Sequence, residues 1–430
     1  MPEAPERVIM KFGGTCLATA ERREAAAARV RERHAAGQAV VVVVSAIGRG
    51  GDPYATDTLL RLLGDAPASP PRERDALIAC GEEISAALFA ALLVQRGVPA
   101  LSLRGFQAGI VTDGRHGDAC IREIRPARVL HHLERGEVVV VAGFQGITPE
   151  GDISTIGRGG SDTSAVALGV ALGAARVEIF TDVDGVLTAD PRIVPAAGRM
   201  SPVTFEEAAE LAHKGATVLH PRAAELAREA GLPVTILTPQ PDSAGTALIS
   251  DAVHRLDPGA RGCAVSVTSR GGIAQVTAGP LDLQARPALL ERIFGAIAER
   301  GVTLDMMNVS TDRAVFTLER GALDRVRAPL ADLGVPYDVR ADCAKVTLVG
   351  GGIHGVPGVM HRVVRALTRA GIAILQSVDS NMIIGVLVEG PREREAVRAI
   401  HAEFFEPAAA GAQAPAAQPG DSGGEGGKGS

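Results

Sequence analysis

The sequence lacks the features of several specialised classes of protein. Its five cysteines include no C-x-x-C pair, which excludes the common zinc and redox motifs, and we expect free thiols in a reducing compartment. No apolar run reaches the roughly 18 to 20 residues that span a bilayer. The first residues, MPEAPERVIMKFGG, are charged and lack the apolar core of a signal peptide. We therefore expect a cytoplasmic protein with no membrane partner.

The chain also lacks an excess of positive charge. Its formal net charge of -6 argues against nucleic acid or another polyanion as a partner. The hydrophobic fraction of 46% is ordinary for a globular protein, and 430 residues predict about two to four domains. Arginine far outnumbers lysine, which is typical of a GC-rich genome or a warm host.

The first half of the chain alternates short apolar runs with helix-forming segments, the pattern of a parallel α/β sheet. Strands are predicted at 7–12, 39–46, 98–103, 137–143, 176–182 and 233–237. Helices are predicted at 20–36, 75–97, 162–174 and 204–213. We expect an α/β domain over 1–245, with an open, mainly parallel sheet and helices on both faces, followed by a linker at 246–262.

The second half contains an internal repeat with an offset of 70 residues. AQVTAG (274–279) matches AKVTLV (344–349), and FTLE (316–319) matches VLVE (386–389). RIFGAIAERGVTLDM at 292–306 matches RVVRALTRAGIAILQ at 362–376 in the same register. Each copy predicts strand, turn, amphipathic helix, strand and strand, so we expect two units, 263–340 and 341–406, packed on each other. The Ala-, Gly-, Pro- and Ser-rich tail, 407–430, is predicted to be disordered.

Glycines follow the first predicted strand, in VIMKFGGTC. Gly13 and Gly14 let the backbone approach a ligand closely and turn N–H groups toward an anion, and Lys11 adds a full positive charge. The carboxyl end of a strand is where open α/β sheets bind ligands. The Walker A spacing is absent. The alternative is a simple turn into a helix.

A second glycine loop, TIGRGGSDTSAV (155–166), precedes a predicted helix that starts near Asp162. Helix N-termini favour anions, and Arg158 can grip a carboxylate with two hydrogen bonds. The alternative for Asp162 is a helix N-cap. The aspartate-rich FTDVDGVLTADPR (180–192) follows another strand and is either a binding loop or a solvated one. All three motifs should meet at one edge of the sheet, which favours a joint site.

Eight segments occur along the chain in this order: KFGGT, VVVVSAIGRGGDPYATDTLL, GEEIS, FQAGI, VAGFQGIT, GRGGSD, TDVDGVLTADPR and VLHPRA. Together they resemble the aspartate kinase (aspartokinase) family of amino acid kinases over residues 7–405. The repeat resembles the paired ACT regulatory domains of these enzymes, which have an α+β, ferredoxin-like fold. The chain looks closest to the diaminopimelate-pathway isozymes of Gram-positive bacteria.

The resemblance implies ATP-dependent phosphorylation of the side-chain carboxylate of L-aspartate to 4-phospho-L-aspartate. This reaction is the first step toward lysine, diaminopimelate, threonine and methionine. ATP is the co-substrate, and Mg²⁺ is carried by ATP rather than by protein ligands. Feedback by lysine, threonine or diaminopimelate at the ACT domains is implied, as is a homo-oligomer formed through these domains.

The family's site residues carry over to matching positions. The resemblance implies catalytic roles for Lys11, Arg158, Asp162 and Asp182. It implies an aspartate site made by Ser45, Thr56, Glu82, Arg158 and Ser161. It implies a nucleotide site made by Lys11, Phe12, Gly13, Gly14, Phe180, Thr181, Asp182, Val186, Leu187, Thr188, Ala189, Asp190, Pro191 and Arg192.

The second repeat carries a Pro-Gly turn before its helix and polar residues at the end of the following strand. We expect an effector site there, or else an ordinary turn and strand edge. Its candidate residues are Val356, Gly358, Gln376, Asp379, Ser380 and Asn381. The first repeat lacks the Pro-Gly turn, so we expect the two units to bind effector unequally.

Three positions depart from the family pattern: Cys16 replaces the usual serine, Leu187 replaces an aromatic, and Thr217 replaces a lysine near the ATP phosphates. Lys214, three residues earlier, is a candidate substitute for that lysine. Two alternatives stay open. One is another amino acid kinase, acting on glutamate, acetylglutamate, carbamate or a nucleotide. The other is a catalytically silent amino-acid sensor.

Overall fold

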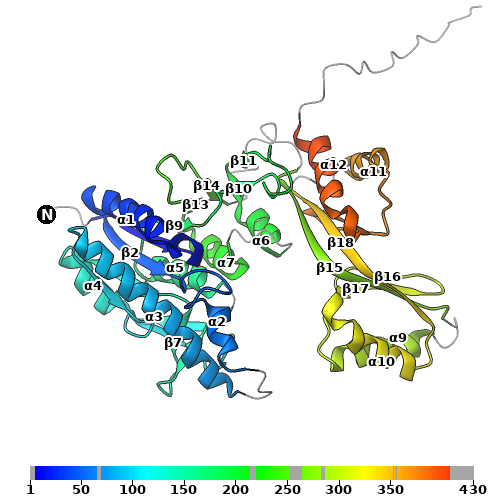
Figure 1. Ribbon diagram of the computed structural model, residues 1–430, viewed down its shortest axis with the longest axis horizontal. Helices are drawn as coiled ribbons and strands as arrows, with labels where there is room; N and C mark the ends of the chain where they lie inside the picture. The colour runs from blue at the N-terminus through cyan, green and yellow to red at the C-terminus, as the bar shows by residue number, and fades with distance from the viewer. Residues whose placement is uncertain are drawn as a thin grey trace, which may run out of the picture.

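The computed structural model describes residues 5–64, 69–157, 159–213, 219–250, 264–281, 286–351, 353 and 356–406. It has two parts that lie side by side: an α/β domain drawn in blue to green, and a second part drawn from yellow-green to red (Figure 1). The predicted α/β class of the first part is confirmed, as is the α+β character of the second.

An eight-stranded sheet forms the centre of the first domain, in the order β12-β14-β13-β9-β1-β2-β6-β3. Its strands are β1 (Arg7–Phe12), β2 (Ala39–Val44), β3 (Ala100–Leu103), β6 (Val138–Ala142), β9 (Arg176–Phe180), β12 (Val203–Thr204), β13 (Val234–Leu237) and β14 (Thr246–Ile249). The six strands from β13 to β3 are parallel, and β14 runs antiparallel to β13. Parallel strands buried on both faces read as continuous apolar runs, as the valines of β2 do.

Helices cover both faces of this sheet. They are α1 (Ala20–Ala35), α2 (Thr56–Arg61), α3 (Pro71–Gln95), α4 (Ala127–Glu134), α5 (Gly160–Ala171), α6 (Phe205–His213), α7 (Pro221–Ala230) and the 3₁₀ turn η1 (Gly14–Leu17). Val40, Val42 and Val44 pack with α1 and α3, whereas Val41 and Val43 pack with α4, α5, α6 and α7. The alternation of side chains along each strand therefore divides the core into two layers.

The α/β domain also contains short strands that the sequence analysis did not predict. A four-stranded sheet, in the order β5-β4-β7-β8, consists of β4 (Ile110–Thr112), β5 (Ile121–Ile124), β7 (Gln145–Ile147) and β8 (Ile153–Thr155). A two-stranded ribbon pairs β10 (Val186–Leu187) with β11 (Arg199–Met200). Strand β14 occupies the beginning of the expected linker, and residues 251–262 of that linker lie outside the described part.

One antiparallel sheet joins both repeats, in the order β16-β17-β15-β18-β20-β19. Its elements are β15 (Ser266–Ala278), α9 (Arg286–Glu299), β16 (Met307–Val309), β17 (Ala314–Glu319), η2 (Arg320–Ala322), α10 (Leu323–Asp332), β18 (Tyr337–Val349), α11 (Val359–Arg369), β19 (Gln376–Asp379), β20 (Ile383–Glu389), η3 (Gly390–Arg392) and α12 (Glu393–Phe405). Each repeat gains a second helix, α10 or α12, that the sequence pattern did not predict. The expected unit boundary at 340/341 falls inside β18, which pairs with β15 along its length. The tail, 407–430, lies outside the described residues.

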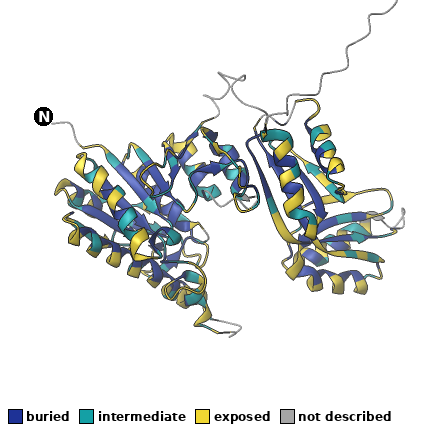
Figure 2. Cartoon of the chain, turned by 45° about the horizontal axis from the view of Figure 1, so that its top comes forward, coloured by how far each residue is buried: buried dark blue, intermediate teal, exposed yellow. Residues whose placement is uncertain are grey.

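Helix α3 is long and apolar enough, by length and composition, to cross a membrane, which corrects the expectation that no segment is. Half of its most apolar window is buried inside the α/β domain. Phe89 and Leu93 pack on β1, β2 and β6, and the carboxyl groups of Asp75 and Glu82 also face inward. Figure 2 shows buried strands covered by helices whose outer faces are exposed. The packing is that of a core helix.

Replacing a buried and an exposed residue of α3 tests this packing. Phe89→Ala removes a fully buried ring and should cost about 3–5 kcal/mol of stability. Leu88→Ala, at a neighbouring residue that is 42% exposed, should change stability by about 0.5 kcal/mol or less. Thermal unfolding followed by circular dichroism measures both. Equal melting temperatures for the two variants would contradict a core role for α3.

Candidate active site

An ion pair between Lys11 and Asp162 lies at the carboxyl end of the parallel sheet. Lys11 Nζ is 2.7 Å from Asp162 Oδ1, and both side chains are mostly buried, at 12% exposed. The second carboxylate oxygen accepts a hydrogen bond from the backbone N–H of His220, at 3.1 Å. Helix α5 begins at Gly160 after an N-cap at Gly159 that has no side-chain cap. The alternative in which Asp162 is the helix N-cap is therefore wrong.

The glycine loop needs its glycines for conformation and for space. Gly157 and Gly159 have φ angles of 81° and 70°, in the left-handed region. A Cβ atom on Gly159 would lie 2.2 Å from the ring of His220. The backbone at Gly159 therefore packs directly against the His220 ring, which leaves no room for a side chain at this position. Arg158, the central residue of the motif, lies outside the described residues.

A cavity of about 730 Å³ opens beside this loop, and we call it the glycine-loop cavity. Four predicted substrate residues line it together with Lys11 and Asp162: Ser45, Thr56, Glu82 and Ser161. Glu82 Oε1 accepts a hydrogen bond from Ala46 N at 2.9 Å, while Oε2 finds no hydrogen-bond partner within the described part of the chain. Burial raises the pKa of Glu82 to about 8. Among the described residues, no cation pairs with this acid.

Asp75 and His116 also line the glycine-loop cavity, and the sequence analysis missed both. The Asp75 carboxylate accepts hydrogen bonds from Thr155 N and Oγ1 and from Gly117 N, and it lies 2.9 Å from His116 Nδ1. It thus ties α3 to β8, which leads into the glycine loop. The available signal was the seven-residue spacing from Glu82, which places both acids on one face of the helix.

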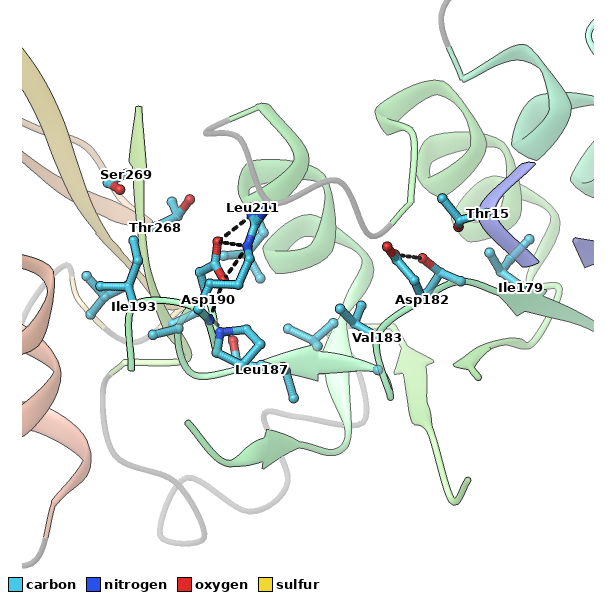
Figure 3. Close-up of a pocket in the computed structure, with 18 of the residues that line it drawn as sticks. Thr15, Ile179, Asp182, Val183, Leu187, Asp190, Ile193, Leu211, Thr268 and Ser269 are labelled. Atoms are coloured by element: carbon cyan, nitrogen blue, oxygen red, sulfur yellow. Dashed lines mark hydrogen bonds and ion pairs between the residues drawn. The ribbon is translucent and has the colours of Figure 1, made fainter. Parts of the chain in front are cut away.

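A second cavity, of about 910 Å³, lies on the other side of the ion pair, and we call it the TADPR cavity (Figure 3). Ten predicted nucleotide-site residues line it: Lys11, Gly14, Thr181, Asp182, Val186, Leu187, Ala189, Asp190, Pro191 and Arg192. Lys11 and Asp162 line both cavities. The two cavities therefore meet at one ammonium group.

The far wall of the TADPR cavity comes from the second part of the chain. Thr268 and Ser269 of β15 lie across from Thr15 and Asp182 (Figure 3). Arg49, also in the lining, pairs with Asp182 at 2.7 Å. The pair of Arg49 and Asp182 does not follow from a local motif, since the two residues are 133 positions apart.

Four predicted nucleotide-site residues do not line the TADPR cavity. Phe12 and Phe180 are fully buried in the core, where their rings stack at a centroid distance of 4.6 Å. Gly13 donates its N–H to the Phe180 carbonyl, at 3.2 Å. Thr188 is buried and its hydroxyl contacts His401 of α12 instead. The phenylalanines can offer only backbone atoms to a ligand.

Two departures from the family pattern are compatible with the geometry. Cys16 occupies η1 and donates its N–H to Gly13 O at 2.9 Å, so the turn is kept. Burial raises the pKa of its thiol to about 11, which makes the thiol unreactive. The four cysteines in the described part, Cys16 among them, are free.

Leu187, the second departure, lines the TADPR cavity as an apolar side chain. Lys214 and Thr217 lie outside the described residues.

The second repeat contains a cavity of about 330 Å³ at the start of α11. Val356, Gly358, Asp379 and Ser380, four of the six residues expected in an effector site, line it. Gln376 instead accepts a hydrogen bond from Gln275 Nε2, at 3.0 Å, and neither it nor Asn381 lines the cavity. We call this space the ACT cavity.

Comparison with known proteins agrees with this geometry. Residues 6–238 match the amino acid kinase family, and residues 346–404 match an ACT domain. The fold and the site therefore define an amino acid kinase with an ACT regulatory part. The family match alone does not specify the substrate, which more similar relatives indicate.

The relatives settle the particular family. The chain is 42% identical to aspartokinase 1 of Bacillus subtilis over 401 residues, which are 93% of this chain and 98% of that one. It is 39% identical to the aspartokinase of Mycolicibacterium smegmatis, over 92% of this chain and 96% of that one. A structure of E. coli aspartokinase III in complex with aspartate and ADP is similar with a TM-score of 0.73 and 27% identity, over 93% of this chain and 100% of that one. This chain belongs to the aspartokinases.

Alanine at Gly159 tests the glycine loop. The variant Gly159→Ala should lose most aspartate-dependent activity, because the new Cβ meets the His220 ring and the backbone is in the left-handed region. Gly173→Ala is the matched control, since Gly173 has a φ of 57° but nothing within 4 Å of its Cβ position. Kinetics and melting temperatures separate clash from strain. Equal activity in both variants would contradict close packing of the loop.

Proposed function

We propose that the two cavities hold the two substrates of the aspartokinase reaction, with L-aspartate in the glycine-loop cavity and ATP in the TADPR cavity. The chain transfers the terminal phosphoryl group of ATP to the side-chain carboxylate of aspartate, forming 4-phospho-L-aspartate and ADP. The observation that carries this assignment is that Lys11 lines both cavities. The structure of E. coli aspartokinase III with aspartate and ADP supports it by similarity.

Lys11 stabilises the phosphoryl group during transfer. Negative charge spreads over the transferred oxygens in the transition state, and a positive group fixed between donor and acceptor stabilises that charge more than the ground state. Asp162 holds the ammonium in place through the 2.7 Å ion pair. The same contact keeps the ammonium group of Lys11 pointing between the two cavities.

Aspartate binds through its charged groups in the glycine-loop cavity. Glu82 pairs with the substrate ammonium, because its second oxygen has no partner in the described part of the chain. Ser45, Thr56 and Ser161 supply hydroxyl groups around the substrate. Arg158 holds a substrate carboxylate, an assignment that comes from the family motif alone. These contacts orient the side-chain carboxylate toward Lys11.

ATP binds along the TADPR cavity. Thr181, Asp182 and all residues of the loop from Val186 to Arg192 except Thr188 surround the nucleotide, and Gly14 and Lys11 line the same cavity. Mg²⁺ accompanies the phosphates and neutralises part of their charge. Among the described lining residues, Asp162, Asp182 and Asp190 each lie in an ion pair with a lysine or arginine. The protein therefore fits an ion carried by ATP better than one held by its own carboxylates.

The ACT cavity takes a feedback amino acid. The turn before α11 offers backbone N–H groups to a carboxylate, and Asp379 offers a negative charge to an ammonium group. Lysine, threonine and diaminopimelate all carry both groups. A structure of E. coli aspartokinase III with lysine and aspartate supports amino-acid regulation by similarity. We place the enzyme in the cytoplasm, at the first step of synthesis of these amino acids, as a homo-oligomer joined through its ACT units.

The first test is ADP release with ATP, Mg²⁺ and either L-aspartate or L-glutamate. Lys11→Ala should lower aspartate-dependent kcat by about 100-fold or more, since it removes the charge that stabilises transfer. Arg135→Ala, at an exposed position after α4, should leave kcat unchanged. No turnover by folded wild-type protein with either amino acid would favour the silent-sensor alternative. Preference for glutamate would favour another amino acid kinase.

The pH dependence of aspartate binding tests Glu82. Its pKa of about 8 means that the carboxyl is mostly neutral below pH 8, whereas pairing with an ammonium needs the carboxylate. KM for aspartate should therefore fall on the order of tenfold from pH 6.5 to 8, while KM for ATP follows no such trend. Glu82→Gln should give a high KM for aspartate that is independent of pH in this range. An unchanged KM in the variant would remove Glu82 from the substrate site.

A further inference from the structure

Thr188 belongs to residues 186–194, which we call the TADPR loop, yet its side chain is directed away from the TADPR cavity and toward helix α12. Its hydroxyl oxygen lies 2.9 Å from His401 Nε2 of α12, and the two residues are 213 positions apart. The same oxygen accepts a hydrogen bond from Gly198 N, at 3.0 Å. Val267 N of β15 donates to the Thr188 carbonyl, at 2.8 Å. Thr188 is therefore held by Gly198 of its own domain and by His401 and Val267 of the second part of the chain.

His401 is suited to hold this hydroxyl. The residue is 2% exposed, and its ring stacks on Phe405 at a centroid distance of 5.0 Å. Burial lowers the pKa of the imidazole, which favours the neutral ring. A neutral ring accepts the hydroxyl proton at Nε2 in one tautomer and donates to the oxygen in the other. Either arrangement ties α12 to Thr188.

The rest of the TADPR loop also packs on the second ACT unit. Ala189 and Val194 share one hydrophobic cluster with Val346, Val397 and Ile400 of that unit. In addition, arginines of α12 donate to backbone carbonyls of the loop: Arg394 to Arg192 O at 2.5 Å and Arg398 to Ile193 O at 2.9 Å. These contacts support the loop from the core of the regulatory unit, while Val186 at its start packs in the core of the kinase domain.

We propose that His401 is a positioning residue for the nucleotide site: by holding Thr188 from α12, it orients the neighbouring residues that line the TADPR cavity. The inference rests on the proposed placement of ATP in that cavity. Leu187 precedes Thr188 directly, and Ala189 to Arg192 follow it, and all of these line the cavity. A regulatory helix therefore forms part of the support of the catalytic site.

The geometry makes the expected effect selective. None of Thr188, Val267 and His401 lines the glycine-loop cavity, whose lining residues come from the kinase domain alone. Loosening the Thr188–His401 contact should therefore weaken ATP binding and leave aspartate binding intact. A general loss of folding would instead change both substrates or the amount of active enzyme.

The test is steady-state kinetics of full-length variants with each substrate varied in turn. Thr188→Val, which keeps the shape but removes the hydroxyl, and His401→Ala should each raise KM for ATP about three- to tenfold, the effect of losing one buried hydrogen bond. KM for aspartate and kcat should stay within about twofold. Thr188→Ser and His401→Gln should restore most of the affinity for ATP. The double variant should be no worse than the more affected single variant, because both substitutions remove the same contact.

A control on the same helix separates this contact from general damage to α12. Glu403 pairs with Arg362 and Arg365 inside the ACT unit. Glu403→Gln should therefore leave KM for ATP at the wild-type value.

Three results would overturn the proposal: an unchanged KM for ATP in Thr188→Val, equal increases for both substrates, or a fall in kcat alone. If His401→Ala fails to fold, the nearly isosteric Thr188→Val still decides. If the wild-type enzyme shows no aspartate-dependent turnover, the proposed function fails. Calorimetric titration of ADP into wild-type and Thr188→Val protein then still decides the inference, with equal affinities overturning it.

Discussion

The ion pair between Lys11 and Asp162 is the interaction on which the rest of the site depends. Taking two charges out of water is costly, and the 2.7 Å contact and the hydrogen bond from His220 N to the same carboxylate offset that cost. Removing either partner would leave a largely buried charge alone. The pair therefore fixes strand β1, helix α5 and the glycine loop relative to one another. It also fixes one positive charge at the point where both cavities end.

The two cavities on either side of this pair differ in their electrostatic balance. In the TADPR cavity, Asp182 and Asp190 are each neutralised by an arginine. In the glycine-loop cavity, Glu82 is an acid whose pKa rises from an ordinary 4.5 to about 8 through burial. Such a group contributes stability that is present below pH 4.5 and is lost as the pH rises through 8. In the proposed assignment, the ammonium group of the substrate supplies the opposite charge that Glu82 lacks among the described residues.

The sequence was sufficient where residue type and near neighbours decide the structure. The valine run of β2 fits only a buried strand, and parallel strands end at one edge, so Lys11, Asp162 and Asp182 could be predicted to meet. Other features depend on contacts between distant residues, which no local pattern records. The TADPR motif marks Thr188 as a ligand residue, yet a partner 213 positions away determines where its side chain lies. The joining of both repeats in one sheet through β15 and β18 is equally non-local.

The packing of the TADPR loop on α12 has a consequence for the order in which the enzyme is completed during synthesis. Domains generally fold as units while the chain grows, at about 5–20 residues per second. Thr188 leaves the ribosome 213 residues ahead of His401, an interval of about 10 to 40 s at that rate. During this interval the strand that carries Lys11 and the wall of the glycine-loop cavity are already made. With aspartate and ATP placed as proposed, the nascent chain can form its amino-acid pocket first, whereas the lining of the TADPR cavity is complete only once the regulatory part is in place.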